Sequence, residues 1–392
     1  MEVATIGIGN GGSKVVDAFL ETSEAFGRDV VSEAYALNTA ESDLRALDRV
    51  PESNRVLLTS PDMPAAGTGN KPDLGARLME QNLTIARNEL ASVPWHSTDA
   101  VVVVAALGGG TGSGGAPVLA RRLRERYDVP VFGLGILPNE SGHMERNAAR
   151  SFMDLGTATD NLLLVDNARY LSPEESIQEN YVRINRDIAR RWVTFLSAGE
   201  QSPGSAEMYV NVADLQAVLE MGGVSVLGYA AKHAETAGGG LLDRLRTNGH
   251  GVDRDAATRN LVETGKTATN DLTMDAELGS AEGVVLLVSG PPAELTQRGI
   301  DEARRYLAER TGAKRIAHGD APRENARKVS AAVLFSNVGT ARRIDDLKQR
   351  ARTVKRDMEE RRDERERKQR DLFTDADDEL ESLGSDGLSS DD

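Results

Sequence analysis

Two glycine-rich turns hold the residue types that bind phosphate. The longer turn runs from Gly108 to Gly115 (GGGTGSGG), after the apolar run VVVVAAL and before a helical pattern that we expect to begin at about Ala116. Glycines let backbone N–H groups approach an anion closely, and a helix N-terminus attracts negative charge. Thr111 and Ser113 add hydroxyl groups to the same turn. The pattern predicts a phosphate cradle, although no lysine follows the last glycine as a P-loop requires, and GxGxxG describes the turn poorly.

The other turn lies near the start of the chain, where GIGNGGSK places four glycines between Gly7 and Gly12. An ordinary dinucleotide-binding fold uses such a turn too, but it places an acidic residue about 20 residues further on. That residue is not clearly present, because the next strand-like run ends in LNTA. Two cradles indicate a polyphosphate held from both sides. A Rossmann oxidoreductase, which needs only one cradle, stays open as an alternative.

The elements that must position these turns alternate along the first half of the chain. Wholly apolar, strand-like runs are separated by helical patterns, which predicts a doubly wound α/β domain whose parallel sheet is covered on both faces. Such sheets bind ligands at the carboxyl ends of their strands. The glycine- and asparagine-rich turns all follow strand-like runs, at residues 9–12, 37–40, 67–75 and 108–115. We therefore expect them to meet at one edge of the sheet.

A long amphipathic pattern from Tyr181 to Leu196 predicts a helix that divides the chain. The strand and helix patterns after it predict a smaller α+β domain. Next comes a highly charged, solvated helix, and the last segment, which is acidic and rich in Gly and Ser, is expected to be disordered. The predicted order is a nucleotide-binding domain, a connecting helix and loop, an α+β domain, a charged helix and an acidic tail, at residues 1–177, 178–206, 207–340, 341–371 and 372–392.

Composition excludes several classes of chemistry. The chain of 392 residues has no cysteine, so disulfides, thiol nucleophiles and cysteine-ligated metals are excluded, and its five histidines show no ligand spacing. The net charge of −15 argues against duplex nucleic acid as a partner. Neither a basic leader segment nor an apolar run of about 18 residues is present, so we expect no membrane span and a cytoplasmic location. The acidic excess resembles proteins from high-salt cells, although a GC-rich genome would also favour arginine over lysine.

The order of the motifs resembles that of the tubulin/FtsZ superfamily. GIGNGGSK is followed by ALNTA, GTGNKPDLG, GGGTGSGG, LPNE, VDN and a helix that carries a Tyr and an Asn. Within the superfamily the chain is most similar to the archaeal CetZ group, because of its alanine-rich strand, the NES insert after Leu137-Pro138 and the charged C-terminal helix. The resemblance implies a GTP-binding cytoskeletal protein that polymerises head to tail, hydrolyses GTP between subunits and controls cell shape. Mg²⁺ would be held chiefly by phosphate oxygens and water.

The resemblance also implies which residues contact the nucleotide. The first turn and the Asn38-Thr39 pair would contact or flank the phosphates, residues 67–70 the terminal phosphate, and residues 108–113 the α- and β-phosphates. Glu140 and Asn167 would face the ribose, and Tyr181 and Asn185 would stack on guanine and read its edge. The implied set is Gly9, Asn10, Gly11, Gly12, Asn38, Thr39, Gly67, Thr68, Gly69, Asn70, Gly108, Gly109, Gly110, Thr111, Gly112, Ser113, Glu140, Asn167, Tyr181 and Asn185.

Two of these assignments have alternatives or departures. Tyr181 could instead be a half-buried core aromatic. The ribose loop departs from the FtsZ pattern, because Met144 stands where an arginine is usual and the nearest arginine is Arg146.

A second site is implied in the loop from Glu207 to Asp214. In the family this loop enters the nucleotide pocket of the next subunit, where two carboxylates three residues apart position the attacking water. Here Asn211 occupies the first of these positions and Asp214 the second. An amide orients water but adds no negative charge, so we expect slow hydrolysis, with Glu207 as a possible substitute. Without the resemblance, Asp214 could equally be an acid that only interacts with a helix N-terminus.

Two further readings share the nucleotide site. A division-ring FtsZ would end in a short apolar peptide that docks its partners, and the tail ends in GLSSDD, although Leu380 to Leu383 is a weak candidate. A GTP-binding regulator that never assembles would explain the altered carboxylate pair. Besides self-association, the charged tail suggests protein partners.

Overall fold

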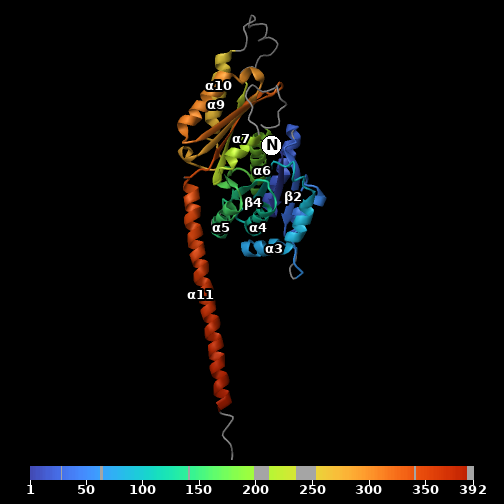
Figure 1. Cartoon of the computed structure of the whole chain (residues 1–392), viewed down its shortest axis with the longest axis vertical. Coiled ribbons are helices and arrows are strands. Elements are labelled where there is room, and N and C mark those ends of the chain that lie inside the picture. The colour runs from blue at the N-terminus through green and yellow to red at the C-terminus, as the bar shows by residue number, and fades with distance from the viewer. Residues whose placement is uncertain are drawn as a thin grey trace, which may run out of the picture.

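The computed structural model describes residues 1–27, 29–61, 65–139, 142–197, 212–234, 253–339 and 341–385. Within these residues, ten strands form one sheet in the order β3-β2-β1-β4-β5-β6-β7-β10-β8-β9 (Figure 1). The strands are β1 (Val3–Ile8), β2 (Val31–Asn38), β3 (Arg55–Leu57), β4 (Ala100–Ala106), β5 (Val131–Leu137), β6 (Asn161–Asp166), β7 (Val224–His233), β8 (Gly283–Gly290), β9 (Arg315–Pro322) and β10 (Lys328–Ser336).

Helices connect most of these strands. The α-helices are α1 (Gly9–Phe26), α2 (Glu41–Arg45), α3 (Pro72–Glu89), α4 (Thr111–Arg126), α5 (His143–Ala158), α6 (Ile177–Leu196), α7 (Val212–Leu219), α9 (Arg254–Ala268), α10 (Gln297–Arg310) and α11 (Arg342–Ser385). Short 3₁₀ helices are η1 (Glu52–Asn54), η2 (Leu90–Ser92), η3 (Asn167–Arg169), η6 (Leu278–Ser280) and η7 (Pro292–Glu294). None of the described helices is both long enough and apolar enough to span a membrane.

The first half of the chain is the expected doubly wound domain. Strands β1 to β6 all pair in parallel with their neighbours in this part of the sheet. Of these, β1, β5 and β6 are buried along their whole length. The hydrophobic cluster on one face of the sheet contains Met79 of α3, Leu119 of α4 and Phe152 of α5. The cluster on the other face contains Phe19 of α1 and Trp192 of α6. Helices therefore cover both faces, as a parallel sheet of apolar strands requires.

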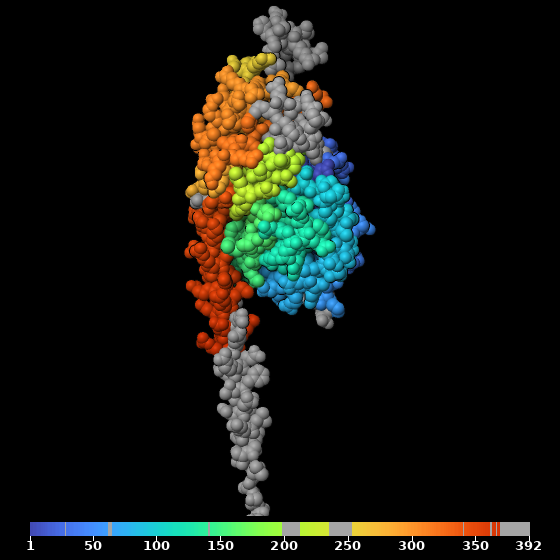
Figure 2. Space-filling model, in the orientation of Figure 1, coloured from blue at the N-terminus to red at the C-terminus, as the bar shows by residue number. Residues whose placement is uncertain are grey.

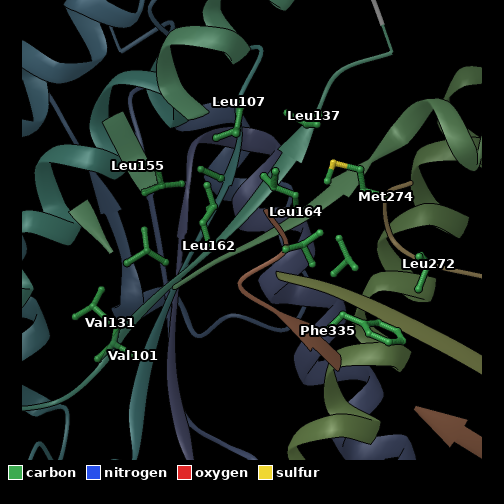
Figure 3. Packing of buried hydrophobic residues seen from close by; sticks show 14 of the residues in the cluster. Val101, Leu107, Val131, Leu137, Leu155, Leu162, Leu164, Leu272, Met274 and Phe335 are labelled. Carbon is green, nitrogen blue, oxygen red and sulfur yellow. The ribbon is translucent and has the colours of Figure 1, made fainter. Parts of the chain in front are cut away.

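The second half continues the same sheet. Strands β7, β10 and β8 pair antiparallel, and β8 pairs in parallel with the edge strand β9. The junction is the short parallel ladder between β6 and β7, and the Asn161 side chain strengthens it by donating to the Leu219 carbonyl at 2.8 Å. Figure 3 shows the core crossing this junction, where Leu162 and Leu164 lie between Leu155 on one side and Met274 and Phe335 on the other.

Helix α6 is the predicted connecting helix, and it begins at a complete capping box. The Ser176 hydroxyl accepts from the Glu179 N–H, and the Glu179 carboxylate accepts from the Ser176 N–H. Further along, Arg191 is almost fully buried and forms ion pairs with Asp187 at 2.6 Å and Asp271 at 2.7 Å. Because Asp271 follows α9, this arginine ties the connecting helix to the second half of the chain.

Two element boundaries differ from the sequence prediction. Helix α4 begins at Thr111 instead of Ala116, so the last glycines of the longer turn lie inside the helix. They are needed there for close packing, because a Cβ atom at Gly114 would overlap the Pro72 carbonyl of α3.

Helix α11 continues to Ser385, past the predicted end at Asp371 and through most of the segment expected to be disordered. Its sequence contains no proline and its first glycine is Gly384, so nothing in the backbone ends it earlier.

Candidate nucleotide site

A cavity of about 550 Å³ lies at the carboxyl ends of β1, β2 and β4, where the sequence predicts the ligand. Several separate segments contribute to its wall. The described residues that line it are Ile8, Gly9, Asn10, Gly11, Lys14, Asn38, Ala40, Ser42, Asp43, Ala66, Gly67, Thr68, Gly69, Asn70, Ala106, Gly108, Gly109, Gly110, Thr111, Gly112, Ile136, Pro138, Met144, Asn167, Tyr181 and Asn185. The turns that the sequence singled out thus meet in one place.

Two helix N-termini open onto this cavity, and both lack a partner for their first amides among the described side chains. Helix α1 begins at Gly9 and helix α4 at Thr111, and neither has a side-chain cap or an acidic residue in its first turn. By contrast, side chains cap α6, α9 and α10, and the uncapped helices α2, α3 and α5 each carry an acidic residue in the first turn. The N-terminal amides and the helix dipole attract anions. The arrangement suits a ligand with more than one phosphate.

The first turn is held against β4 by close backbone contact. Gly9 has a φ of 72°, in the left-handed region that favours glycine, and it starts α1 at the cavity wall. A Cβ atom at Gly11 would lie 2.6 Å from the Ala106 Cβ, and one at Gly12 would overlap the Val104 carbonyl. Larger residues would push α1 away from the sheet and open the cradle.

The longer turn has one face toward the cavity and one toward its neighbours. A Cβ atom at Gly109 would meet no atom within 4 Å, whereas one at Gly110 would overlap the Thr68 hydroxyl. The Thr111 hydroxyl bonds with that of Thr39 at 2.7 Å, which joins the turns after β4 and β2. Ser113 donates to the Leu107 carbonyl at 2.5 Å. These hydrogen bonds join the turn to the neighbouring segments and so fix its shape.

Most of the described residues named from the sequence as nucleotide contacts line the cavity, but three do not. Gly12, Thr39 and Ser113 are buried behind the wall, where they pack or hydrogen-bond against the lining segments. Glu140 lies outside the described residues. Lys14, Ser42, Asp43 and Met144 line the cavity without having been predicted as ligand contacts. Lys14 could have been found from its spacing, because it follows Asn10 by one helical turn.

The far end of the cavity has the residues expected for a ribose and a base. Tyr181 and Asn185 lie one turn apart on α6, and both line the cavity. Tyr181 is 39% exposed and faces the cavity, which argues against the half-buried core aromatic that the sequence left open. Asn167 is buried, and no described residue donates to its Oδ1 atom. A buried acceptor without a donor is costly, and a ligand hydroxyl would remove that cost.

The cavity carries little formal charge. Among its described lining residues, Lys14 is the one cation and Asp43 the one anion, and Asp43 accepts from the Asn38 side chain at 3.1 Å. The described residues contain no group of three His, Asp or Glu side chains that could hold a metal ion. An anionic ligand would therefore be held mainly by backbone amides, and a metal ion would take most of its ligands from that anion and from water.

Asp214 lies apart from this cavity. It occupies the first turn of α7, and its Oδ1 atom is 2.8 Å from Nη2 of Arg315 at the start of β9. None of the described residues that line the cavity belongs to α7. Glu207 and Asn211 lie outside the described residues. If Asp214 acts on a nucleotide, that nucleotide is bound by another subunit.

Comparison with known proteins agrees with this geometry. Residues 2–172 match the GTPase domain of the Tubulin/FtsZ family, the class that the sheet and the two-cradle cavity define. Residues 174–353 match the C-terminal domain of tubulin-like CetZ proteins. The chain belongs to the CetZ group of the tubulin/FtsZ family.

Two tubulin-like proteins of Haloferax volcanii illustrate the relationship. CetZ1 is 40% identical over 92% of this chain and 94% of its own length, and CetZ3 is 38% identical over 98% and 100%.

Solved structures give the same result. The GDP-bound monomer of H. volcanii CetZ1 has a TM-score of 0.81 at 35% identity, covering 91% of this chain and all of that one. The GTPγS-bound protofilament of CetZ2 from the same organism also has a TM-score of 0.81, at 31% identity, covering 92% of this chain and all of that one. An FtsZ from M. jannaschii shares the fold, with a TM-score of 0.67 at 19% identity.

Proposed function

We propose that this protein binds GTP in the cavity and polymerises head to tail into cytoplasmic filaments that control cell shape. The observation that carries the proposal is the meeting of two uncapped helix N-termini, α1 and α4, at one glycine-lined cavity. The chain belongs to the CetZ group, in which CetZ1 has been solved with GDP and CetZ2 as a GTPγS-bound protofilament. These relatives support both the ligand and the assembly.

In this proposal the phosphates lie over the two cradles. Their charge is matched by the amides of residues 9–12 and 108–112 and by Lys14, with residues 67–70 at the terminal phosphate. The base stacks on Tyr181 with Asn185 at its edge, and Asn167 and Glu140 face the ribose. Mg²⁺ would bind to phosphate oxygens and water, which suits a cavity whose described lining has a single carboxylate.

Hydrolysis would be completed by the α7 segment of the next subunit. Asp214 is the carboxylate we assign to the attacking water, supported by Asn211 and Glu207. Asp214 is not among the described residues that line the cavity of its own chain. It could therefore reach a nucleotide only across a contact between two subunits, which favours this assignment. Since Asn211 is neutral and Arg315 pairs with Asp214, we expect slow turnover.

A sedimentation experiment tests assembly. Purified protein in high KCl with Mg²⁺ is incubated with GTP, GTPγS, GDP or ATP and then centrifuged. The proposal predicts a pellet with GTP and a larger one with GTPγS, because blocked hydrolysis stabilises the contact, and little with GDP or ATP. Binding of GTP without any pellet would favour the non-assembling regulator. A fluorescent fusion that stays as a ring at mid-cell would favour the division protein.

A further inference from the structure

The first turns of α11 dock on the nucleotide-binding half of the protein. Figures 1 and 2 show this helix running along α5, although it follows the second half in sequence. Ile344 and Leu347 are each only 1% exposed, so this part of α11 is packed into the core. The contact with α5 continues to Met358, whose Sδ atom accepts from Nη1 of Arg150 at 3.8 Å, and the far part of the helix leaves the body of the molecule (Figure 1).

One side chain of this docked segment contacts the wall of the cavity from behind. Arg343 Nη1 lies 3.3 Å from Glu145 Oε1, and its Nε lies 3.4 Å from Asp166 Oδ2. Its Nη2 also donates to the Pro138 carbonyl at 3.4 Å. Arg350, two turns later, lies 3.2 Å from the other oxygen of Glu145.

These contacts all adjoin residues that line the cavity. Pro138 lines it directly, Glu145 follows the lining residue Met144, and Asp166 precedes Asn167. Asp166 also accepts from the Ala168 N–H at 3.1 Å and so caps the short helix η3 that carries Asn167. Arg343 itself is not among the described lining residues. It therefore acts on the ribose side of the cavity through its neighbours.

The charges around Arg343 predict that its loss would weaken nucleotide binding. The side chains of Glu145 and Asp166 are 14% and 12% exposed, and Arg343 lies between them. Removing one partner of a buried ion pair leaves an uncompensated charge. Without Arg343, Glu145 would keep its pair with Arg350, but Asp166 would lose its cation among the described residues and stand next to a cavity that we expect to receive phosphates. The wall would loosen, and the added negative charge would repel the ligand.

We propose that Arg343 is a positioning residue for the nucleotide, which couples the docking of α11 to the shape of the ribose side of the cavity. The inference rests on the proposed function, because it takes the ligand to be a guanine nucleotide. Coupling between two binding events is reciprocal. Nucleotide binding therefore holds α11 more firmly on α5, and a partner that pulls α11 away weakens nucleotide binding.

The first experiment compares GDP affinities of full-length variants by calorimetry, with Mg²⁺ and below the assembly threshold. Arg343→Gln should weaken binding by about fivefold or more, a typical size for coupling between sites. Arg343→Lys should recover part of the loss, because it keeps the charge but not the forked geometry. Arg342→Gln is the matched control, since Arg342 is an exposed residue of the same turn and loses the same charge. Equal affinities in the Arg342→Gln and Arg343→Gln variants would overturn the inference.

Hydrogen exchange separates coupling from a merely structural role. GDP should slow amide exchange across residues 344–351 in the wild type and in Arg342→Gln, but much less in Arg343→Gln. Equal protection by GDP in both variants would contradict the coupling. If Arg343→Gln does not fold, as judged by its melting curve without nucleotide, Arg343→Lys takes its place in both measurements. A wild type that fails to bind GDP would overturn the proposed function as well, whereas binding that is unchanged in the variants would overturn only the role of Arg343.

Discussion

At the scale of single residues, the glycines of the two cradles have different tasks. Gly11, Gly12, Gly110 and Gly114 are required because neighbouring atoms occupy the space of a side chain. Gly109 differs, because its missing side chain would point into the open cavity. A substitution there tests ligand binding without disturbing the packing, which a substitution at Gly110 would not do.

We predict that Gly109→Ala folds normally and binds GTP more weakly. The added methyl group takes space that a phosphate needs, and overpacking of this kind costs about 1–3 kcal/mol. That cost corresponds to a rise in Kd of about 5- to 150-fold. Calorimetry with GTP measures it, and Gly279→Ala, at an exposed glycine whose Cβ would also meet nothing, is the control. Unchanged affinity in Gly109→Ala would remove this turn from the phosphate site.

We predict that Asp214→Asn keeps GTP affinity and loses about 10²-fold or more in the rate of phosphate release. The substitution preserves shape and removes the carboxylate that we assign to the attacking water. Its filaments should last longer after GTP is exhausted, as light scattering would show. Glu220→Gln removes an equal charge from an exposed position just after α7 and should behave as the wild type. Normal turnover in Asp214→Asn would exclude Asp214 from the mechanism.

The sequence predicts which turns form the cavity better than it predicts which residues face it. A glycine-rich motif places a turn at the end of a strand, but which side of the turn faces the ligand depends on the packing of the helices beside it. This is why Gly12, Thr39 and Ser113 lie behind the wall. Met144 lines the cavity through the orientation of α5, which no local pattern specifies.

At the scale of elements, helix N-termini that lack both a side-chain cap and an acidic first turn mark the site. Among the α-helices whose N-terminal caps the structure describes, α1 and α4 alone have neither a side-chain cap nor an acidic residue in the first turn. Helix α6 has a capping box instead, which the sequence carries as SIQE. Strand β9 had no clear signal, because RIAHGDAP is partly exposed and polar and becomes a strand only by pairing with β8. The extent of α11 was underestimated because an exposed helix needs no apolar stripe.

Truncation of α11 at two points separates its docked part from the rest. Deletion after Asp371 should leave the melting temperature unchanged, because the strongly buried residues of this helix, Ile344 and Leu347, lie in its first turns. Deletion after Val338 removes both and should destabilise the protein by about 3 kcal/mol or more. Thermal unfolding followed by circular dichroism measures both effects. A large loss of stability from the shorter deletion would mean that the distal helix packs against the body.

At the scale of the whole molecule, one sheet joins a nucleotide cavity to a second half that carries Asp214. If Asp214 completes the site of a neighbouring subunit, as we propose, repeated copies must stack in one direction. Such a contact is heterologous and does not close, which produces a filament. The same contact must form between subunits that each carry a net charge of −15.

Salt should therefore promote assembly. Like-charged subunits repel each other, and raising KCl from about 0.1 M to about 1 M shortens the screening length from about 10 Å to about 3 Å. We predict that the threshold concentration for sedimentation with GTP falls over this range. Potassium glutamate at the same ionic strength controls for effects specific to chloride. A threshold that rises with salt would indicate that ion pairs across the contact dominate over net repulsion.

The most direct test of the account is phosphate release with GTP and Mg²⁺ in molar KCl, measured as protein concentration is varied. An active site formed between subunits predicts almost no release below a threshold and a steep rise above it. Asp214→Asn should bind GTP and assemble at a similar threshold while releasing little phosphate. Release strictly proportional to protein concentration, or none despite bound GTP and visible filaments, would contradict the claim that one subunit completes the site of the next.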